Sequence, residues 1–206
     1  MLINIETIVK KYGTPTGIIH VGSHYLEERQ DYQKVGLYNT VWIDGNDKII
    51  SDLSANTALQ PDEKIIHCVV SDVDGQPTKF YITNNGQSSS ILEFGTHKDY
   101  YPGIQVTEVK EFNTKRLDTL FTENNISFSS RNFINLDIQG AELLALKGSG
   151  KIIDSIKYIY SEVNEEPLYK NCCLIHEMDN YLNSFGFVRV ETEITHCRWG
   201  DALYVR

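Results

Sequence analysis

The stretch Gly17-Ile-Ile-His-Val-Gly22 is a short apolar run that ends in glycine, and it decides the fold class. Such a run is typical of a buried strand whose chain must turn sharply at its end. The stretch Thr40-Val-Trp-Ile-Asp44 has the same character and ends in an acid. Continuous apolar strands, unlike alternating ones, are typical of a parallel sheet that helices cover on both faces.

Helical and strand patterns alternate along much of the chain, which supports this interpretation. Further strands are expected at residues 64–71, 133–137 and 158–163. Helices are expected at residues 2–12, 27–35, 48–59, 115–124, 141–147 and 174–185. Thr114 precedes the fourth of these helices and is the type of residue that caps a helix N-terminus.

The middle and the end of the sequence follow other patterns. Residues 78–83 and 106–112 alternate like exposed strands, and residues 84–101 between them, rich in Asn, Gly and Ser, suggest a long functional loop. Residues 187–195 and 201–206 predict a closing hairpin, which adds one antiparallel strand to the parallel sheet. No repeat or linker divides the sequence. We expect one domain over residues 1–206, with an N-terminal helix in 1–15 and a Rossmann-like core in 16–206.

Composition excludes several classes of partner. The net charge of −9 and the scattered basic residues disfavour nucleic acids and anionic membranes. The four cysteines form no CxxC pair and no zinc-like spacing with histidine, so we expect free thiols in a reducing compartment. No apolar run approaches the roughly 20 residues that span a bilayer, and the first residues lack a signal-peptide pattern. A cytoplasmic protein is therefore expected.

Gly22 and Asp44 stand at the ends of the first two predicted strands and indicate a nucleoside site. Glycine lets the backbone approach a ligand, and an acid about 20 residues later binds ribose hydroxyls. Both residues also suit ordinary turns. A dinucleotide site needs GxGxxG, but positions 24 and 27 are His and Glu. A pyrophosphate would meet Glu27 and Glu28 at the helix start, whereas a cationic sulfonium ligand would not be repelled.

The stretch Phe133-Ile-Asn-Leu-Asp137-Ile-Gln-Gly-Ala-Glu142 is the strongest signal. An apolar strand runs into an acid, and a glycine follows at the start of an amphipathic helix. Ligands of open α/β sheets bind beyond the carboxyl ends of strands, so Asp137 is expected in the same crevice as Gly22 and Asp44. The alternative is that Asp137 only caps the helix.

Five blocks of sequence together resemble the FkbM family of methyltransferases. They are Val21-Gly-Ser-His-Tyr-Leu-Glu27, Val41-Trp-Ile-Asp44, Ser88-Ser-Ser-Ile-Leu92, Leu136-Asp-Ile-Gln-Gly-Ala-Glu142 and Gly200-Asp-Ala-Leu-Tyr-Val205. They occur in the family's order, and the similarity covers roughly residues 17–206. The resemblance implies a Rossmann-like class I methyltransferase fold, with a mostly parallel seven-stranded sheet and a C-terminal antiparallel hairpin. It also implies S-adenosylmethionine as cofactor and O-methylation, often of sugars.

The resemblance assigns roles to individual residues. Gly22 and Ser23 would face the cofactor, Asp44 would bind its ribose, and Asp72 would lie near the adenine. Asp137 would lie beside the methyl-transfer position, and His24 and Gly45 complete the candidate cofactor site. The sequence departs from the family at four positions: His20 replaces a usual acid, Leu26 a usual glycine, Asn135 a frequent lysine, and Gln139 a frequent glutamate.

The catalytic candidates are Asp137, Glu162 and His196. A general base near the acceptor hydroxyl would aid transfer; the candidates for it are His196, Glu162, Asp137 and His24. His196 also suits an exposed loop, and Glu162 an edge salt bridge. Asp137, Glu162 and Asn164 offer hard oxygen ligands for Mg²⁺, which we weigh as the lesser alternative.

The acceptor candidates lie in the long loop and near the terminal turn. They are Ser88, Ser89, Tyr101 and Trp199, and they offer hydroxyls and aromatic faces to a carbohydrate acceptor, a glycan or glycoconjugate. Polar-loop and core roles are the alternatives. Two other functions stay open: an NAD-binding Rossmann oxidoreductase, which Gly22 and Asp44 alone would permit, and a non-catalytic methyltransferase-like binding domain. The sequence is also compatible with a homo-oligomer.

Overall fold

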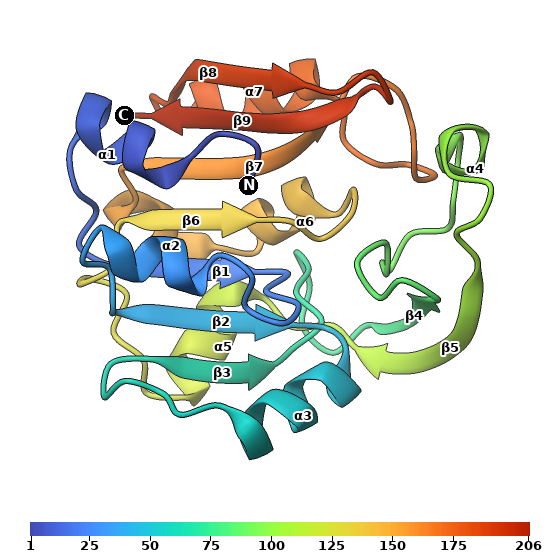
Figure 1. Ribbon diagram of the computed structural model, residues 1–206, viewed down its shortest axis with the longest axis horizontal. Coiled ribbons are helices and arrows are strands. Elements are labelled where there is room, and N and C mark those ends of the chain that lie inside the picture. The colour runs from blue at the N-terminus through green and yellow to red at the C-terminus, as the bar shows by residue number, and fades with distance from the viewer.

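The computed structural model describes residues 1–206 and is built on one seven-stranded sheet (Figure 1). Its strands are β1 (Ile18–Val21), β2 (Thr40–Asp44), β3 (Lys64–His67), β6 (Phe133–Leu136), β7 (Tyr158–Asn164), β8 (Val188–Ile194) and β9 (Trp199–Val205), in the order β3-β2-β1-β6-β7-β9-β8. Strand β9 is antiparallel to both of its neighbours, and the other pairings are parallel. The predicted α/β fold with a C-terminal hairpin is confirmed.

Helices cover both faces of this sheet because its buried strands carry apolar side chains on both sides. Helices α1 (Ile5–Tyr12), α2 (Arg29–Lys34) and α3 (Asp47–Asn56) pack on one face. Helices α5 (Leu117–Glu123), α6 (Glu142–Lys147) and α7 (Ile175–Asn183), with the 3₁₀ helix η1 (Gly150–Ser155), pack on the other. Alternate residues of β1 serve the two cores: Ile18 lies in the first and Ile19 in the second.

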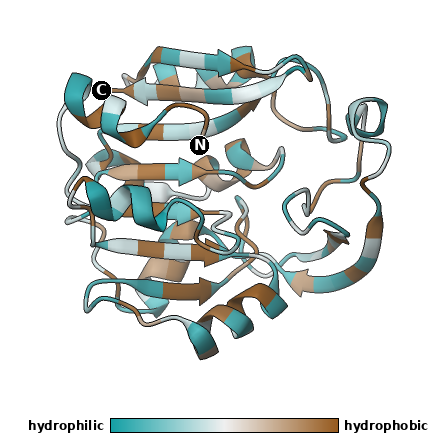
Figure 2. Cartoon of the chain, viewed as in Figure 1, coloured by the Kyte–Doolittle hydropathy of each residue, from teal (hydrophilic) through white to brown (hydrophobic).

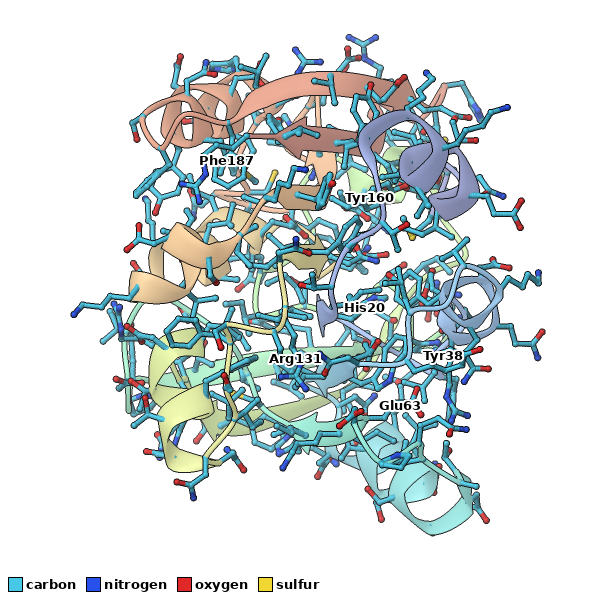
Figure 3. All side chains as sticks on the ribbon, turned by 90° about the vertical axis from the view of Figure 1, so that its left-hand side faces the viewer. His20, Tyr38, Glu63, Arg131, Tyr160 and Phe187 are labelled. Atoms are coloured by element: carbon cyan, nitrogen blue, oxygen red, sulfur yellow. The ribbon has the colours of Figure 1, made fainter.

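The hydropathy of the side chains agrees with this arrangement in two layers. Figure 2 shows helices striped with hydrophilic and hydrophobic residues, as expected when only one helix face is buried. In Figure 3, His20 and Tyr160 lie toward the α1 and α2 layer, and Phe187 lies toward α7. None of the helices combines the length and apolar character that a membrane crossing requires.

A second, two-stranded antiparallel sheet projects beyond the carboxyl ends of the main strands (Figure 1). It consists of β4 (Pro77–Thr83) and β5 (Val106–Asn113), which matches the two exposed strands predicted there. Residues 84–105, the cover segment, connect them and contain helix α4 (His97–Tyr100). The segment is therefore more ordered than the loop expected from its composition. Phe94 bridges to Tyr169, which docks it onto the main domain.

The sequence interpretation misplaced one cap. Helix α5 begins at Leu117 with Arg116 at its N-cap position, and Thr114 does not cap it. Lys115 instead forms a parallel bridge with Val70, so the chain is still extended at this point. The Thr114 hydroxyl donates to the Val73 carbonyl at 2.6 Å.

Candidate active site

A cavity of about 370 Å³ opens at the carboxyl ends of β1, β2, β6 and β7, beneath the cover segment. Its volume lies within the usual range for a small-molecule site. Ten of the predicted site residues line it: Gly22, His24, Asp44, Gly45, Ser88, Ser89, Tyr101, Asp137, Glu162 and Trp199. The strand ends therefore bring together residues that lie far apart in the sequence.

Gly22 allows the ends of β1 and β6 to approach each other closely. Its φ is 89°, and a Cβ at this position would lie 1.7 Å from the carbonyl oxygen of Asp137. The backbone N–H of Asp137 donates to the Val21 carbonyl at 2.9 Å. Because the obstacle is backbone, any side chain at position 22 would push Asp137 out of place.

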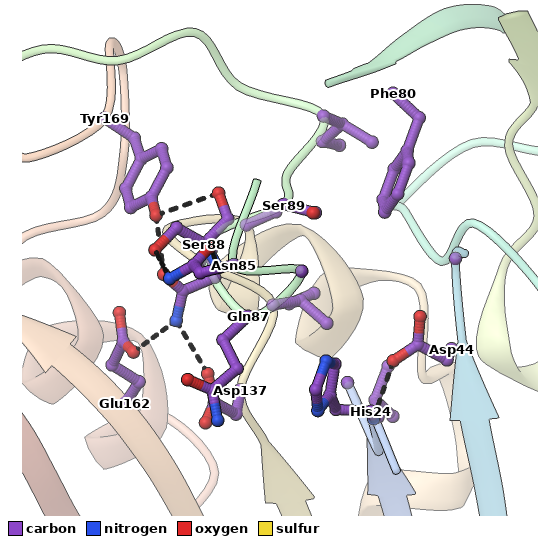
Figure 4. A pocket seen from close by; sticks show the side chains of 18 of the residues that line it. His24, Asp44, Phe80, Asn85, Gln87, Ser88, Ser89, Asp137, Glu162 and Tyr169 are labelled. Carbon is purple, nitrogen blue, oxygen red and sulfur yellow. Dashed lines mark hydrogen bonds between the residues drawn. The ribbon is translucent and has the colours of Figure 1, made fainter. Parts of the chain in front are cut away.

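Asp44 lies at the end of β2 with 8% of its surface exposed. Its carboxylate accepts hydrogen bonds from the backbone N–H groups of His24 and Asn46, both at 2.8 Å. Burial raises the pKa of Asp44, although both hydrogen bonds favour the ionised form. Figure 4 shows Asp44 and His24 side by side at the cavity wall, with Phe80 above them. The neighbouring Gly45 is also confined, because a Cβ there would lie 2.7 Å from the Phe80 ring.

Asp137 and Glu162 form a pair of carboxyl groups joined by an amide. Gln139 Nε2 donates to Asp137 Oδ1 at 2.8 Å and to Glu162 Oε2 at 2.7 Å (Figure 4). The Tyr169 hydroxyl donates to Gln139 Oε1 at 2.5 Å and so orients the amide. Gln139 itself has a left-handed backbone, with φ of 57°. Such strain in a non-glycine residue is often found at functional sites.

The surroundings raise the pKa of both carboxyl groups. The enclosing protein, followed by the charge of Asp201, raises the pKa of Asp137 to about 6, although Asp137 remains open to the cavity. Burial, followed by the charge of Asp137, raises the pKa of Glu162 well above its usual range. At neutral pH Asp137 is therefore mostly ionised, whereas Glu162 holds its proton more tightly than an ordinary carboxyl group does.

Three residues important to this geometry were missed from the sequence. Gln139 appeared there only as a departure from the family pattern. Glu142, which is 1% exposed, accepts the backbone N–H groups of Ile138 and Gly140 at 3.0 and 3.1 Å and so holds the turn in place. Tyr169 reaches the site from an irregular stretch after β7, where no sequence pattern marks it.

The acceptor candidates line the cavity from the cover segment and from the start of β9. Trp199 Nε1 donates to the Tyr101 hydroxyl at 2.8 Å, which ties the start of β9 to the end of α4. The Ser89 hydroxyl accepts the backbone N–H of Thr83 at 3.1 Å. Ser88 presents its carbonyl to the Tyr169 hydroxyl at 3.3 Å. The wall thus combines aromatic rings with hydroxyl and amide groups.

Three predicted site residues do not line the cavity. Ser23 is buried behind it, and its hydroxyl has no hydrogen-bond partner. Asp72 lies outside the wall, where it accepts the Ser71 hydroxyl at 3.2 Å. His196 is exposed in the turn between β8 and β9. Strand β9 begins at Trp199, which lines the cavity, whereas the turn that carries His196 precedes this strand and lies outside the cavity wall.

Nothing in the cavity assembles a metal site. No group of three or more His, Cys, Asp or Glu residues is arranged to hold a metal ion. Asn164, the third member of the suggested magnesium set, does not line the cavity.

The family of the chain follows from comparison with known proteins. Residues 20–189 match the model of the methyltransferase FkbM domain. This chain belongs to the FkbM methyltransferase family. It is thus an S-adenosylmethionine-dependent methyltransferase, and S-adenosylmethionine is its cofactor. No curated protein sequence matches it significantly.

This FkbM methyltransferase is similar in fold to solved structures, and the first two below support the fold. An uncharacterised protein of Listeria monocytogenes is 7% identical, with a TM-score of 0.53 over 100% of this chain and 67% of that one. The methyltransferase domain of bacterial CtHen1 is 7% identical, with a TM-score of 0.50 over 98% and 95%. Magnesium protoporphyrin IX methyltransferase of Synechocystis, solved with its bound methyl donor, is 10% identical, with a TM-score of 0.48 over 92% and 69%.

The cavity of this FkbM methyltransferase fits a donor that carries a sulfonium, an ammonium, a ribose and an adenine. Glu28 and Asp137 line it and offer negative charge to the two cationic groups. Asp44 offers carboxylate oxygens to hydroxyls, and Val70 and Phe80 offer an apolar wall to a flat ring. The residues present therefore suit S-adenosylmethionine.

Two family departures have structural explanations. His20 is 1% exposed and faces the α1 and α2 layer, with its Nδ1 3.3 Å from the Tyr32 hydroxyl. Burial lowers the pKa of His20 to about 4, so the imidazole is neutral and part of the core. Leu26 keeps the left-handed backbone that glycine usually supplies, with φ of 61°, while its buried side chain packs in the same core.

Proposed function

We propose that this FkbM methyltransferase transfers the methyl group of S-adenosylmethionine to a hydroxyl of a sugar within a glycan or glycoconjugate. The observation that carries the proposal is the composition of the cavity. A carboxyl pair at the strand ends lines the same cavity as Tyr101 and Trp199 and as several amide and hydroxyl groups. Aromatic faces and such polar groups are what a polyol ring requires, since one side of the ring is apolar and its edge is polar.

On the donor side, the residues act by binding and orientation. When bound, the donor supplies a methyl group on a sulfonium. We assign Asp44 to the ribose hydroxyls and the ionised Asp137 to the positive charge beside the reacting carbon. Gln139 holds Asp137 at 2.8 Å and limits its movement. Positioning of this kind supplies much of the acceleration of a displacement reaction.

On the acceptor side, charge favours a neutral ligand. The protein carries a net charge of −9, so a nucleic-acid acceptor would be repelled, whereas a glycan would not. The cover segment lies over the cavity and limits the acceptor to one that can enter beside it. All four cysteines are free, which suits a reducing compartment, and we propose that the reaction occurs in the cytoplasm.

The test offers labelled S-adenosylmethionine with panels of glycans, small phenols, RNA and a protein extract, and locates the label by mass spectrometry. We expect label on glycan hydroxyls. Label on phenols, RNA or protein side chains, with none on any glycan, would overturn the sugar assignment. Calorimetry checks the cofactor in parallel: S-adenosylhomocysteine should bind, and NAD should give no measurable heat. Turnover in EDTA tests the magnesium alternative, which unchanged activity would remove.

A further inference from the structure

His97 is a buried histidine in the cavity wall that the candidate site above does not use. It is the first residue of α4 and lines the cavity from the cover segment. Only 3% of its surface is exposed, and its Nδ1 has no hydrogen-bond partner. Folded proteins satisfy almost all buried polar atoms, so an unpaired ring nitrogen in a cavity wall calls for an explanation.

Packing, and not hydrogen bonding, orients this imidazole. The Phe94 ring stacks on it with centroids 4.3 Å apart and planes 7° apart. The rings of Tyr101 and Tyr169 lie at 5.1 and 5.4 Å. The backbone N–H groups of Gly95 and His97 both donate to the Leu168 carbonyl, at 2.7 and 3.1 Å. The ring is therefore held in place with Nδ1 buried, so that Nε2 is the ring nitrogen left for a ligand.

The protonation state of His97 also suits proton abstraction. Burial alone lowers its pKa, since no carboxylate or cation contributes. The titratable groups packed against the ring are the hydroxyls of Tyr101 and Tyr169. The imidazole is thus neutral at neutral pH and keeps a lone pair available.

The other candidate bases are less suited. Gln139 already donates to both Asp137 and Glu162, and burial raises the pKa of Glu162 well above its usual range. His24 Nδ1 is hydrogen-bonded to Glu27 at 2.5 Å, and although burial opposes the shift, this contact raises the pKa of His24. His196 is exposed outside the cavity wall.

We propose that His97 is the catalytic general base that takes the proton of the acceptor hydroxyl; this rests on the function proposed above. The acceptor oxygen forms a bond to the methyl carbon, and the carbon–sulfur bond breaks with its electron pair returning to sulfur. The O–H bond of the acceptor breaks, and its proton passes to a ring nitrogen of His97 and from there to solvent. The products are the methyl ether, S-adenosylhomocysteine and a proton.

The contacts of the His97 ring extend to the acceptor candidates and to the carboxyl pair. Tyr101 lies against the imidazole and is hydrogen-bonded to Trp199, so the imidazole lies next to the acceptor candidates. Tyr169 lies against the imidazole on another side, and its hydroxyl holds Gln139, which holds Asp137. We place the acceptor between the His97 imidazole and Asp137.

The test compares His97→Phe, His97→Ala and His196→Ala on the glycan that wild type methylates. Phenylalanine keeps the stacking on Phe94 but has no basic nitrogen. General-base catalysis contributes about 10²–10⁴-fold, so both His97 variants should lose at least about 100-fold in kcat, whereas His196→Ala should stay within about twofold. Binding of S-adenosylhomocysteine should be unchanged in all three. Added imidazole should restore turnover to His97→Ala, because it can occupy the vacated space, and not to His97→Phe.

Further outcomes distinguish failure of the base role from failure of the proposed function. The base role is overturned if wild type labels a hydroxyl and His97→Phe does so at a comparable rate. It is also overturned if both variants lose donor binding and thermal stability in step with activity and imidazole restores nothing, since His97 then serves only packing. By contrast, absence of label on any hydroxyl in wild type overturns the proposed function itself. NMR titration of wild type must also show a His97 imidazole that is neutral at pH 7.

Discussion

A single amide explains one departure of this chain from its family. Gln139 stands where glutamate is frequent, and its Nε2 lies between Asp137 and Glu162. A glutamate in this position would add a third carboxyl group to a pair whose pKa values are already raised. The amide instead donates to both partners, which supports an ionised Asp137 at neutral pH.

At the same scale, Asp44 is predicted to dominate cofactor affinity. Asp44→Ala should weaken S-adenosylhomocysteine binding by about 1.5–3 kcal/mol, roughly 10- to 150-fold in Kd, because it removes a charged acceptor of hydrogen bonds. Calorimetry measures the change, and a thermal melt accounts for the lost bonds to His24 and Asn46. Asp72→Ala is the matched control, since Asp72 lies outside the cavity wall. An equal loss in the control would contradict the assignment.

The raised pKa of Asp137 predicts that pH changes the affinity for the methyl donor more than the affinity for its product. Its pKa of about 6 means that it is ionised at pH 7.5 and mostly protonated at pH 5.5. The ionised fraction falls about fourfold over this interval, so the affinity for the sulfonium donor should fall by about that factor. The neutral thioether product should change much less. In Asp137→Asn the difference between the two ligands should disappear. A donor affinity that rises on acidification would refute this role.

At the scale of elements, the packing of β1 against β6 builds the site. Both Gly22 and Gly36 have positive φ, at 89° and 80°, but only at Gly22 would a Cβ meet backbone. Nothing lies within 4 Å of a Cβ at Gly36. Gly36→Ala should therefore cost only the left-handed strain of about 1–2 kcal/mol, whereas Gly22→Ala should cost more and abolish donor binding. Urea unfolding and calorimetry check both, and similar losses in the two variants would refute the close-approach argument.

For the whole molecule, the buried carboxyl groups of Glu142 and Glu162 predict how stability depends on pH. Burial raises the pKa of Glu142 to about 7 and that of Glu162 well above its usual range. The folded state then binds protons more tightly than the unfolded state, so the free energy of unfolding should rise as pH falls from 8 to 6.5. Below pH 6.5 the buried, neutral His20 opposes this trend, because the unfolded chain gains its proton first.

Thermal melts between pH 8 and 6.5 test this prediction. Glu162→Gln should flatten the rise, because the amide does not titrate. The exposed Glu111→Gln should leave the slope as in wild type. A melting temperature that falls over this interval in wild type would contradict the raised pKa values.

The class of fold and the strand ends that form the site can be predicted from the sequence alone. Continuous apolar runs are sufficient for a buried parallel sheet, and Gly22, Asp44 and Asp137 were recognisable because a strand end is a local feature. Parallel strands end at one edge, so residues at those ends meet without further information.

The other side chains of the site can be identified only in the folded chain. Tyr169 reaches Gln139, 30 residues away in sequence, and His97 reaches the cavity because Phe94 pairs with Tyr169. His196 was left outside, although it is close in sequence to Trp199. These outcomes depend on how irregular segments dock onto the sheet. Hydrophobic periodicity predicts helices and strands, and it does not predict contacts between distant loops.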